Sequence, residues 1–275
     1  MLFRSNDSVR LVKGSHIVVQ KLYAGNHAYI LQNDDGRVIF MIPYQGRYTL
    51  IGTTDVALKC APERPQASSE EIDYLCRAAN RYLEKPLNPN DVVWSYAGVR
   101  PLYDDGSTNP SAVTRDYTLR LDTDQGNAPV LSVFGGKITT YRKLAEHVME
   151  KLRPWFPDMK PPWTDTVPLA GGESFNAEIQ VPDWRALPSE ALAAIQSRHG
   201  SRAAHVLLGV KTREHLGTDF GANLYAREID YMMDHEWAMT GEDVLYRRSK
   251  AGLHMSEVQH RQVEAYVAGR ARRSH

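Results

Sequence analysis

The sequence has little cysteine and no excess of charge of either sign. Cys60 and Cys76 are the only cysteines in 275 residues, and they do not follow a CxxC or zinc-binding spacing. This scarcity favours a reducing compartment and no structural metal. Lysine plus arginine equal aspartate plus glutamate at 33 each. No overall electric field therefore draws the chain toward nucleic acid, and we expect no nucleic-acid partner.

Long hydrophobic runs are also missing. No stretch approaches the ~20 apolar residues of a membrane-spanning helix, and the first residues contain no apolar core of signal-peptide length. Hydrophobic residues make up 42% of the chain, which is ordinary for a globular protein with one large or two modest domains. We therefore expect a cytoplasmic protein, either soluble or peripheral to a membrane.

Several motifs of common enzyme classes do not occur. The sequence contains neither the dinucleotide-binding GxGxxG nor the phosphate-binding GxxxxGK[ST] pattern. It has no GxSxG element, and its histidines do not group as HxH, HExxH or HxxxH. These absences argue against a metal site and against serine-hydrolase chemistry.

The most informative stretch that is present runs over Val130–Leu144. A short β-branched run meets Gly135 and Gly136, and a helical pattern follows at once. This order places backbone N–H groups and the positive end of a helix dipole where a ligand can approach closely. Lys137 adds a positive charge, and Thr139 adds a hydroxyl. The corner suits a phosphate, a carboxylate or the electron-accepting edge of a cofactor, although a tight turn with a solvated lysine gives the same pattern.

Two arginines and a histidine are further candidates. Arg100 follows an aromatic strand and precedes a proline, so we expect it to be held rigidly at a strand end, where it could bind a phosphate or carboxylate bidentately. Arg115 has a similar setting beside Asp116, and His16 begins a β-rich run. Each of these residues taken alone is equally typical of a solvated or structural side chain.

The first half of the chain reads mostly as strands. The only helix expected before the Gly-Gly corner is capped by Ser68 or Ser69, has Glu70 and Glu71 in its first turn, and stops at Pro86. The close spacing of the strands leaves no room for crossover helices, so the sheet should be largely antiparallel. The expected strands are His16–Val19, Ala28–Leu31, Val38–Ile42, Tyr48–Ile51, Val92–Tyr96, Tyr117–Leu121 and Val130–Phe134.

The second half reads as helices after a proline-rich linker. Apolar residues recur there at helical spacing over Ser189–Arg198, His205–Leu208, Asn223–Ala238, Gly241–Leu253 and Met255–Gly269. We predict an α+β fold: a domain over 1–153 with a mixed, largely antiparallel sheet, a linker over 154–166, and a small all-α domain over 167–275.

The motifs, taken in order, resemble those of FAD-dependent (aerobic, respiratory) glycerol-3-phosphate dehydrogenase, over nearly the whole chain. The matching segments are Val9–Val19, Ile42–Tyr44, Ile51–Asp55, Gly98–Leu102, Thr114–Tyr117, Val130–Lys143, Leu169–Gly172 and Asp243–His254. The resemblance implies the substrate-binding and flavin-facing part of a D-amino-acid-oxidase-like FAD oxidoreductase, followed by a helical domain.

The resemblance also implies roles for the candidate residues. Arg100 and Arg115 would hold the substrate phosphate, and His16 would assist removal of the proton from the C2 hydroxyl. Lys137 would act in both catalysis and substrate binding, and Thr139 would contact substrate. The residues that would face the pyrimidine edge of the flavin are Gly135, Gly136, Lys137, Ile138 and Thr139.

One feature of the family is missing from the sequence, namely the N-terminal FAD-binding segment with its GxGxxG turn. We therefore expect the C-terminal half of such an enzyme, inactive alone and dependent on that segment. The whole enzyme would oxidise sn-glycerol 3-phosphate to dihydroxyacetone phosphate, pass hydride to FAD and electrons to quinone, and lie peripherally on the inner face of the cytoplasmic membrane. A homodimer is left open. The alternatives are a non-catalytic interaction module and another FAD-dependent oxidase of the same fold.

Overall fold

The structure is a computed structural model that describes residues 8–104, 116–123, 128–173 and 187–272. It divides into two compact units, Met1–Thr164 and Asp165–His275. The boundary between the units falls within the proline-rich segment of the sequence. The domain limits 1–153, 154–166 and 167–275 themselves stay a prediction.

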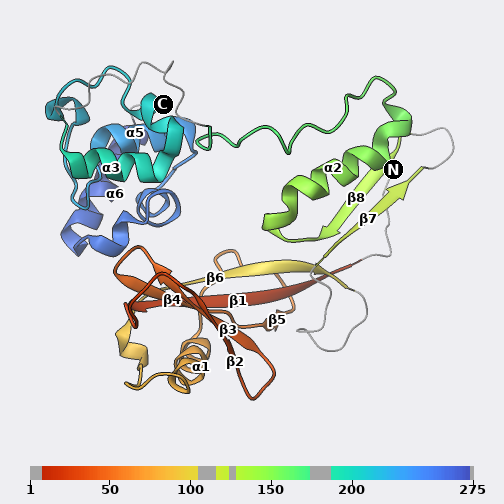
Figure 1. The fold of residues 1–275 in the computed structure, drawn as a ribbon, viewed down its shortest axis with the longest axis horizontal. Coiled ribbons are helices and arrows are strands. Elements are labelled where there is room, and N and C mark those ends of the chain that lie inside the picture. Colours follow the sequence, from red (N-terminus) through yellow and green to blue (C-terminus); the bar gives the residue numbers. More distant parts are fainter. Residues whose placement is uncertain (1–7, 105–115, 124–127, 174–186, 273–275) are drawn as a thin grey trace. The chain divides into compact units, whose positions relative to one another are not determined.

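The first unit is built on a twisted antiparallel sheet with β1 at its centre (Figure 1). One edge of β1 pairs with β4 and then with β5, while β6 runs along the whole other edge. β3 and β2 extend the sheet beyond β4. Every one of these pairings is antiparallel, as the short strand spacing predicts. The strands are β1 (Val9–Gln20), β2 (Tyr29–Gln32), β3 (Val38–Tyr44), β4 (Tyr48–Gly52), β5 (Val56–Leu58) and β6 (Val92–Tyr103).

Helix α1 (Ser69–Asn80) covers one face of this sheet and closes its hydrophobic core (Figure 1). Ser68 and Glu71 form a capping box at its start, in agreement with the predicted cap. The helix ends before the predicted stop at Pro86, because the Asn80 side chain exchanges two hydrogen bonds with the backbone of Leu87. The core comprises Ile17, Val19, Leu31, Ile39, Met41, Ile51, Leu75, Cys76, Ala78, Ala79 and Leu87. The short helix η1 (Pro89–Asp91) leads into β6.

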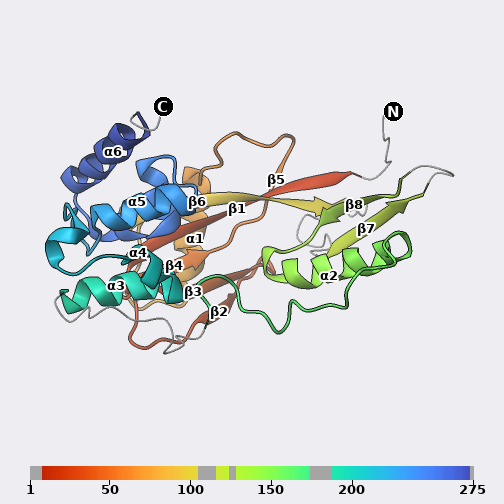
Figure 2. The ribbon, with the colours of Figure 1, turned by 90° about the horizontal axis from the view of Figure 1, so that it is seen from above.

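A hairpin and a helix complete the first unit. Strands β7 (Tyr117–Asp122) and β8 (Val130–Gly135) form a separate two-stranded sheet, and α2 (Tyr141–Leu152) lies alongside it in both views (Figures 1 and 2). The short helices η2 (Ile138–Thr140) and η3 (Arg153–Trp155) flank α2. None of the described residues from Asp116 to Glu173 is buried. These described residues therefore form no hydrophobic core of their own.

The second unit is helical, as predicted, and its described residues bury two hydrophobic clusters. The predicted helix over Gly241–Leu253 is wrong as a single α-helix. It is a π-helical turn followed by Lys250 in the left-handed conformation (φ 61°) and then a 3₁₀ turn. The Ser249 hydroxyl donates to the Val244 carbonyl, which closes the first turn and ends it. The helices are α3 (Ser189–His199), η5 (Gly200–Arg202), α4 (Ala203–Val206), η6 (Arg213–Leu216), α5 (Ala226–His235), η7 (Asp243–Arg248), η8 (Ala251–His254) and α6 (Glu257–Ala271).

Candidate active site

The register between β1 and β6 brings His16 and Arg100 to the same face of the sheet. His16 pairs with Tyr96 and Val12 pairs with Arg100, so all four side chains point to one side. This is the face opposite the one that α1 covers. Arg100 lies within β6 and not at a strand end as predicted, because pairing with β1 continues to Tyr103.

Two glycines make room for these side chains. An ideal Cβ at Gly14 would lie 2.4 Å from Nη2 of Arg100, and one at Gly52 would lie 2.1 Å from Cδ2 of His16. The guanidinium and the imidazole therefore lie directly over backbone that carries no side chain. The role of these glycines had no signal in the sequence, because it depends on which strands pair.

Arg100 is held in place by the turn that follows β4. Its Nη1 lies 3.0 Å from Oδ1 of Asp55, and its Nη2 donates to Oγ1 of Thr53 at 3.1 Å. The side chain is 29% exposed. Thr53 and Asp55 of this turn thus orient the guanidinium and leave part of it open to a ligand.

His16 is kept neutral by its surroundings. Its ring stacks on Tyr96 with the centroids 4.9 Å apart and the planes inclined by 5°. Burial and the nearby Arg100 guanidinium lower the pKa of His16 to about 4. Its Nδ1 atom is buried and has no hydrogen-bond partner among the described residues. The neutral imidazole has a lone pair that can accept a proton from a substrate hydroxyl, while the adjacent cation makes the resulting imidazolium short-lived.

Apolar side chains continue this face beyond His16. Phe40 pairs with Gly52, which in turn pairs with His16, so Phe40 lies on the same face as His16. Ile30 and Ile42 join it on this side of β2 and β3, and all three side chains are exposed. The site face thus includes a row of large apolar residues that the described part of the first unit does not bury.

The Gly-Gly-Lys corner follows β8. Gly135 and Gly136 have φ values of 73° and 93°, and an ideal Cβ at Gly135 would lie 3.1 Å from both the Tyr103 nitrogen and the Asp116 carbonyl oxygen. Only glycine fits there without strain. A 3₁₀ turn comes next, with its first N–H groups unpaired within the turn, and the predicted α-helix begins only at Tyr141. The exposed residues of the corner are Lys137, Ile138 and Thr139.

The corner is joined to the strand that carries Arg100. Tyr103, in β6, contacts the Phe134 ring of β8 with the centroids 6.1 Å apart. Arg120 of β7 donates to the Tyr103 hydroxyl at 3.0 Å. Arg115, the other predicted phosphate ligand, lies outside the described residues.

Two structural features are absent from the described part of the chain. Its helices include none with the length and apolarity needed to cross a bilayer. The same residues contain no group of three or more histidine, cysteine, aspartate or glutamate side chains that could hold a metal ion.

Residues 1–142 match the FAD dependent oxidoreductase family, and residues 162–269 match the C-terminal domain of alpha-glycerophosphate oxidase. The chain belongs to the FAD-dependent oxidoreductase family. The predicted membership of the FAD-dependent oxidoreductases is thereby confirmed, and so is the fold class with its antiparallel sheet and C-terminal helices.

Individual relatives with known names show which members of the family this chain is similar to. The chain is 46% identical over 269 residues to the glycerol-3-phosphate dehydrogenase of Pseudomonas aeruginosa, which covers 96% of this chain and 52% of the relative. It is 44% identical to the aerobic glycerol-3-phosphate dehydrogenase of Escherichia coli, and the match covers 94% of this chain and 53% of that relative. It is also 47% identical to the D-erythritol 1-phosphate dehydrogenase of Brucella abortus, and the match covers 93% of this chain and 52% of that relative. The chain spans about half the length of these relatives.

A solved structure has the same fold. The glycerol-3-phosphate dehydrogenase of Bacillus halodurans, determined in complex with FAD, superposes with a TM-score of 0.69 at 24% sequence identity. The match covers 96% of this chain and 57% of that one.

Proposed function

We propose that this chain is the substrate-binding and C-terminal part of an FAD-dependent glycerol-3-phosphate dehydrogenase. The complete enzyme would oxidise sn-glycerol 3-phosphate to dihydroxyacetone phosphate. The supporting observation is the neutral His16 imidazole beside the fixed Arg100 guanidinium on one face of the sheet. A phosphorylated alcohol needs both groups, a cation for the phosphate and a base for the hydroxyl.

In this proposal Arg100 binds the substrate phosphate, with Arg115 as a second cation. Asp55 and Thr53 keep the Arg100 guanidinium oriented, so little side-chain entropy is lost when the phosphate binds. His16 takes the proton from the oxygen on C2 of the substrate. The positive charge of Arg100 disfavours the imidazolium that results, so His16 releases the proton readily and returns to its neutral form.

FAD supplies the hydride acceptor when it is bound, and the Gly-Gly-Lys corner fits one edge of its flavin ring. The two positive-φ glycines carry no side chain that would keep a ligand away, and Lys137 is exposed beside them. We assign Gly135, Gly136, Lys137, Ile138 and Thr139 to the pyrimidine edge of the ring. The lysine and the helix start would stabilise negative charge at that edge.

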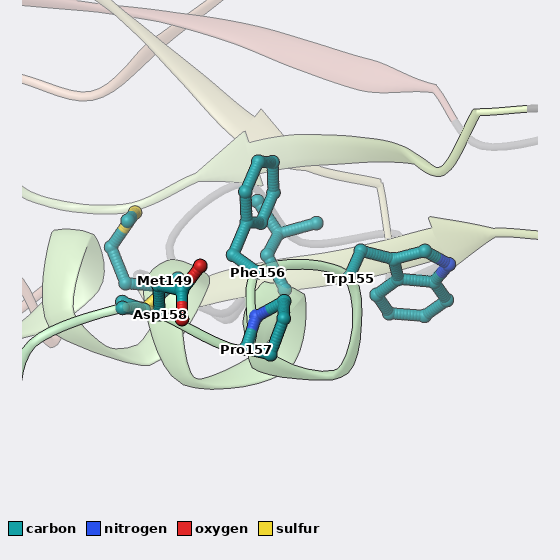
Figure 3. Close-up of a pocket in the computed structure, with 7 residues that line it drawn as sticks. Met149, Trp155, Phe156, Pro157 and Asp158 are labelled. Carbon is teal, nitrogen blue, oxygen red and sulfur yellow. The ribbon is translucent and has the colours of Figure 1, made fainter.

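We further propose that an FAD-binding segment, such as the other half of the relatives, covers the hairpin and α2. Met149, Trp155 and Phe156 are exposed at the end of this helix. An isolated hairpin and a helix of this length are marginal in water without a packed apolar face. An apolar pocket also opens at the end of α2 (Figure 3), lined by Met149, Leu152, Trp155, Phe156, Pro157, Asp158 and Met159.

The resemblance alone supports the remaining assignments. We propose that the complete enzyme passes electrons to a quinone and associates peripherally with the inner face of the cytoplasmic membrane. A homodimer stays a prediction.

Complementation tests this function. The purified chain would be mixed with the separately produced N-terminal half of the Pseudomonas aeruginosa relative and with FAD, and dye reduction by sn-glycerol 3-phosphate would be measured. We expect retained FAD and activity only when both halves are present. Turnover by this chain alone, with stoichiometric FAD, would contradict the dependence on a second half. A complex that retains FAD without turnover would support the interaction module.

A second substrate is favoured by the 47% identity to D-erythritol 1-phosphate dehydrogenase. The same assay should compare the two polyol phosphates and include Arg100→Ala. For a phosphate-ester substrate we expect this variant to raise KM at least ~10-fold, because a charge-assisted contact contributes about 1.5–3 kcal/mol. Activity on a non-phosphorylated alcohol or amine that Arg100→Ala leaves unchanged would favour another oxidase of the same fold.

A further inference from the structure

We infer that Glu71 is a positioning residue for the candidate active site, acting from the opposite face of the sheet. Its carboxylate joins the segment of β1 that carries His16 to the turn that holds Arg100. Only the consequence for substrate binding rests on the proposed function. The positioning itself is a property of this chain.

One carboxylate oxygen of Glu71 connects two segments that are distant in sequence. Oε1 accepts a hydrogen bond from Oγ of Ser15 at 2.9 Å and another from Oγ1 of Thr54 at 2.7 Å. The Thr54 hydroxyl in turn accepts from the backbone N–H of Ser15 at 2.9 Å. The three groups form a closed and buried hydrogen-bonded triangle.

The other oxygen ties the same carboxylate to the start of α1 and to β1. Oε2 lies 2.8 Å from Nζ of Lys13 and accepts from the backbone N–H of Ser68 at 2.9 Å. Glu71 is only 6% exposed. Burial alone would raise the pKa of this carboxyl, but its hydrogen bonds with Lys13, Ser68, Thr54 and Ser15 hold it below its ordinary value. Glu71 is therefore charged in the folded protein.

Each anchor of the triangle adjoins a residue of the site. Ser15 stands between His16 and Gly14, over which the Arg100 guanidinium lies. Because side chains alternate along a strand, Ser15 faces α1 while its neighbours face the site.

Thr54 stands in the same relation to the turn. Its two neighbours, Thr53 and Asp55, both bind the Arg100 guanidinium. The bonds from Glu71 to Ser15 and Thr54 thus fix the backbone on both sides of Arg100.

Helix capping explains the hydrogen bond at only one of the two carboxylate oxygens of Glu71. The capping box uses the bond from Oε2 to Ser68, and a carboxylate is not needed to pack α1 on the sheet. Burying the charge is costly unless every lone pair is used. The bonds from Oε1 to Ser15 and Thr54 meet that need only because the strand and the turn present hydroxyls at the same point.

The test is a titration of His16 in the full 275-residue chain, followed by NMR of its imidazole. Thr54→Val keeps the side-chain shape and removes the hydroxyl, while Glu71→Gln removes the charge. Burial and the nearby Arg100 charge lower the pKa of His16. If Arg100 and the turn move away, water reaches the imidazole and the positive charge is more distant, so both causes weaken. We expect its titration midpoint to rise by about one pH unit in both variants. Thr54→Ser should keep the wild-type midpoint.

A higher His16 midpoint in Glu71→Gln distinguishes a positioning role of Glu71 from a direct effect of its charge. Loss of the Glu71 charge alone would lower the His16 midpoint, because a nearby carboxylate favours the imidazolium. The matched control is Glu70→Gln, which removes a charge from the same first turn, where Glu70 is exposed and interacts with Ser68 and Ser69. It should leave the midpoint unchanged.

The outcomes are distinct. A lower unfolding temperature in Thr54→Val with the wild-type His16 midpoint would overturn the inference and leave Glu71 a structural residue. Adding sn-glycerol 3-phosphate to the wild-type chain tests the proposed function separately. If the ligand leaves the His16 signals unchanged while the midpoint still rises in Thr54→Val, the positioning role stands and the substrate assignment fails.

Discussion

The Arg100 guanidinium occupies the space that a side chain at Gly14 would need. An ideal Cβ there would lie 2.4–2.7 Å from three guanidinium atoms. The strand that carries the catalytic candidate His16 thus also provides the surface on which the phosphate-binding candidate rests.

Gly14→Ala should therefore displace Arg100 with little harm to the fold. The clash is with the end of a flexible side chain, so the guanidinium moves and the backbone does not. We expect the affinity for sn-glycerol 3-phosphate to fall by about 10-fold or more, as for loss of one charge-assisted contact. Binding is measured by calorimetry and stability by thermal unfolding.

Gly98→Ala is the matched control for this prediction. Gly98 pairs with Gly14 across the two strands, yet nothing lies within 4 Å of its ideal Cβ. This variant leaves the Arg100 guanidinium in place, so it should lose less affinity than Gly14→Ala. Equal affinities for the two variants would show that the position of Arg100 over Gly14 does not matter.

His16 should destabilise the first unit in acid. Its pKa is about 4 in the folded protein and about 6.5 when unfolded, so the unfolded chain binds more protons between these values. Stability associated with this residue is present above pH 6.5 and is lost as the pH falls toward 4. The loss is on the order of 2–3 kcal/mol. Denaturant unfolding from pH 7 to 4 should have a shallower pH slope in His16→Gln; an unchanged slope would contradict the neutral buried imidazole.

His199 should have the opposite effect on the second unit. Burial alone would lower its pKa, but hydrogen bonds to Glu228 and Glu236 raise it to about 9. The folded state therefore binds more protons above pH 6.5. The stability is full below pH 6.5 and is lost as the pH rises through 9, by about 3 kcal/mol.

Unfolding of the second unit between pH 6.5 and 9.5 measures this loss. His199→Gln, which does not titrate, should lack the slope. The Glu228 side chain that faces His199 is fully buried and also binds Arg198. A slope that survives in His199→Gln would assign the titration to another group.

Gly252→Ala should destabilise the second unit by about 1–3 kcal/mol, because overpacking a core forces side chains and backbone to shift. An ideal Cβ at this position would lie 2.8–3.1 Å from three atoms of the Tyr246 ring. Gly269→Ala in α6 is the control, since nothing lies within 4 Å of its Cβ. It should stabilise by about 0.5–1 kcal/mol through helix propensity. Thermal unfolding of both variants checks the contrast, and equal effects would remove the packing argument.

Local signals in the sequence predicted most elements of the first unit. Runs of β-branched residues marked the strands, and Ser68 with Glu71 marked the start of α1. Both depend on residues near one another in the chain. The site depended on strand register, which composition does not determine. The sequence pointed to Arg100 and His16 singly, but their position over Gly14 and Gly52 required the pairing of β1 with β4 and β6.

The hydrogen bonds from Glu71 to the site segments could not be predicted from neighbouring residues either, because they too depend on tertiary packing. Its partner Ser15 is far away along the chain and meets it only after α1 packs on the sheet. In the second unit, the helical spacing over Gly241–Leu253 was real, but periodicity does not reveal a left-handed residue such as Lys250 in its middle.

The flat position of His16 and Arg100 over glycines has a consequence for selectivity. Side chains that lie flat along a sheet form a flat binding surface. Such a surface can bind a phosphate and a neighbouring hydroxyl, but it does not contact the far end of the carbon chain and so does not select its length. If the proposed function holds, discrimination between three-carbon and four-carbon substrates must come from groups that face this sheet from the other side. Attempts to change substrate length by redesign should target those groups and leave this sheet face intact.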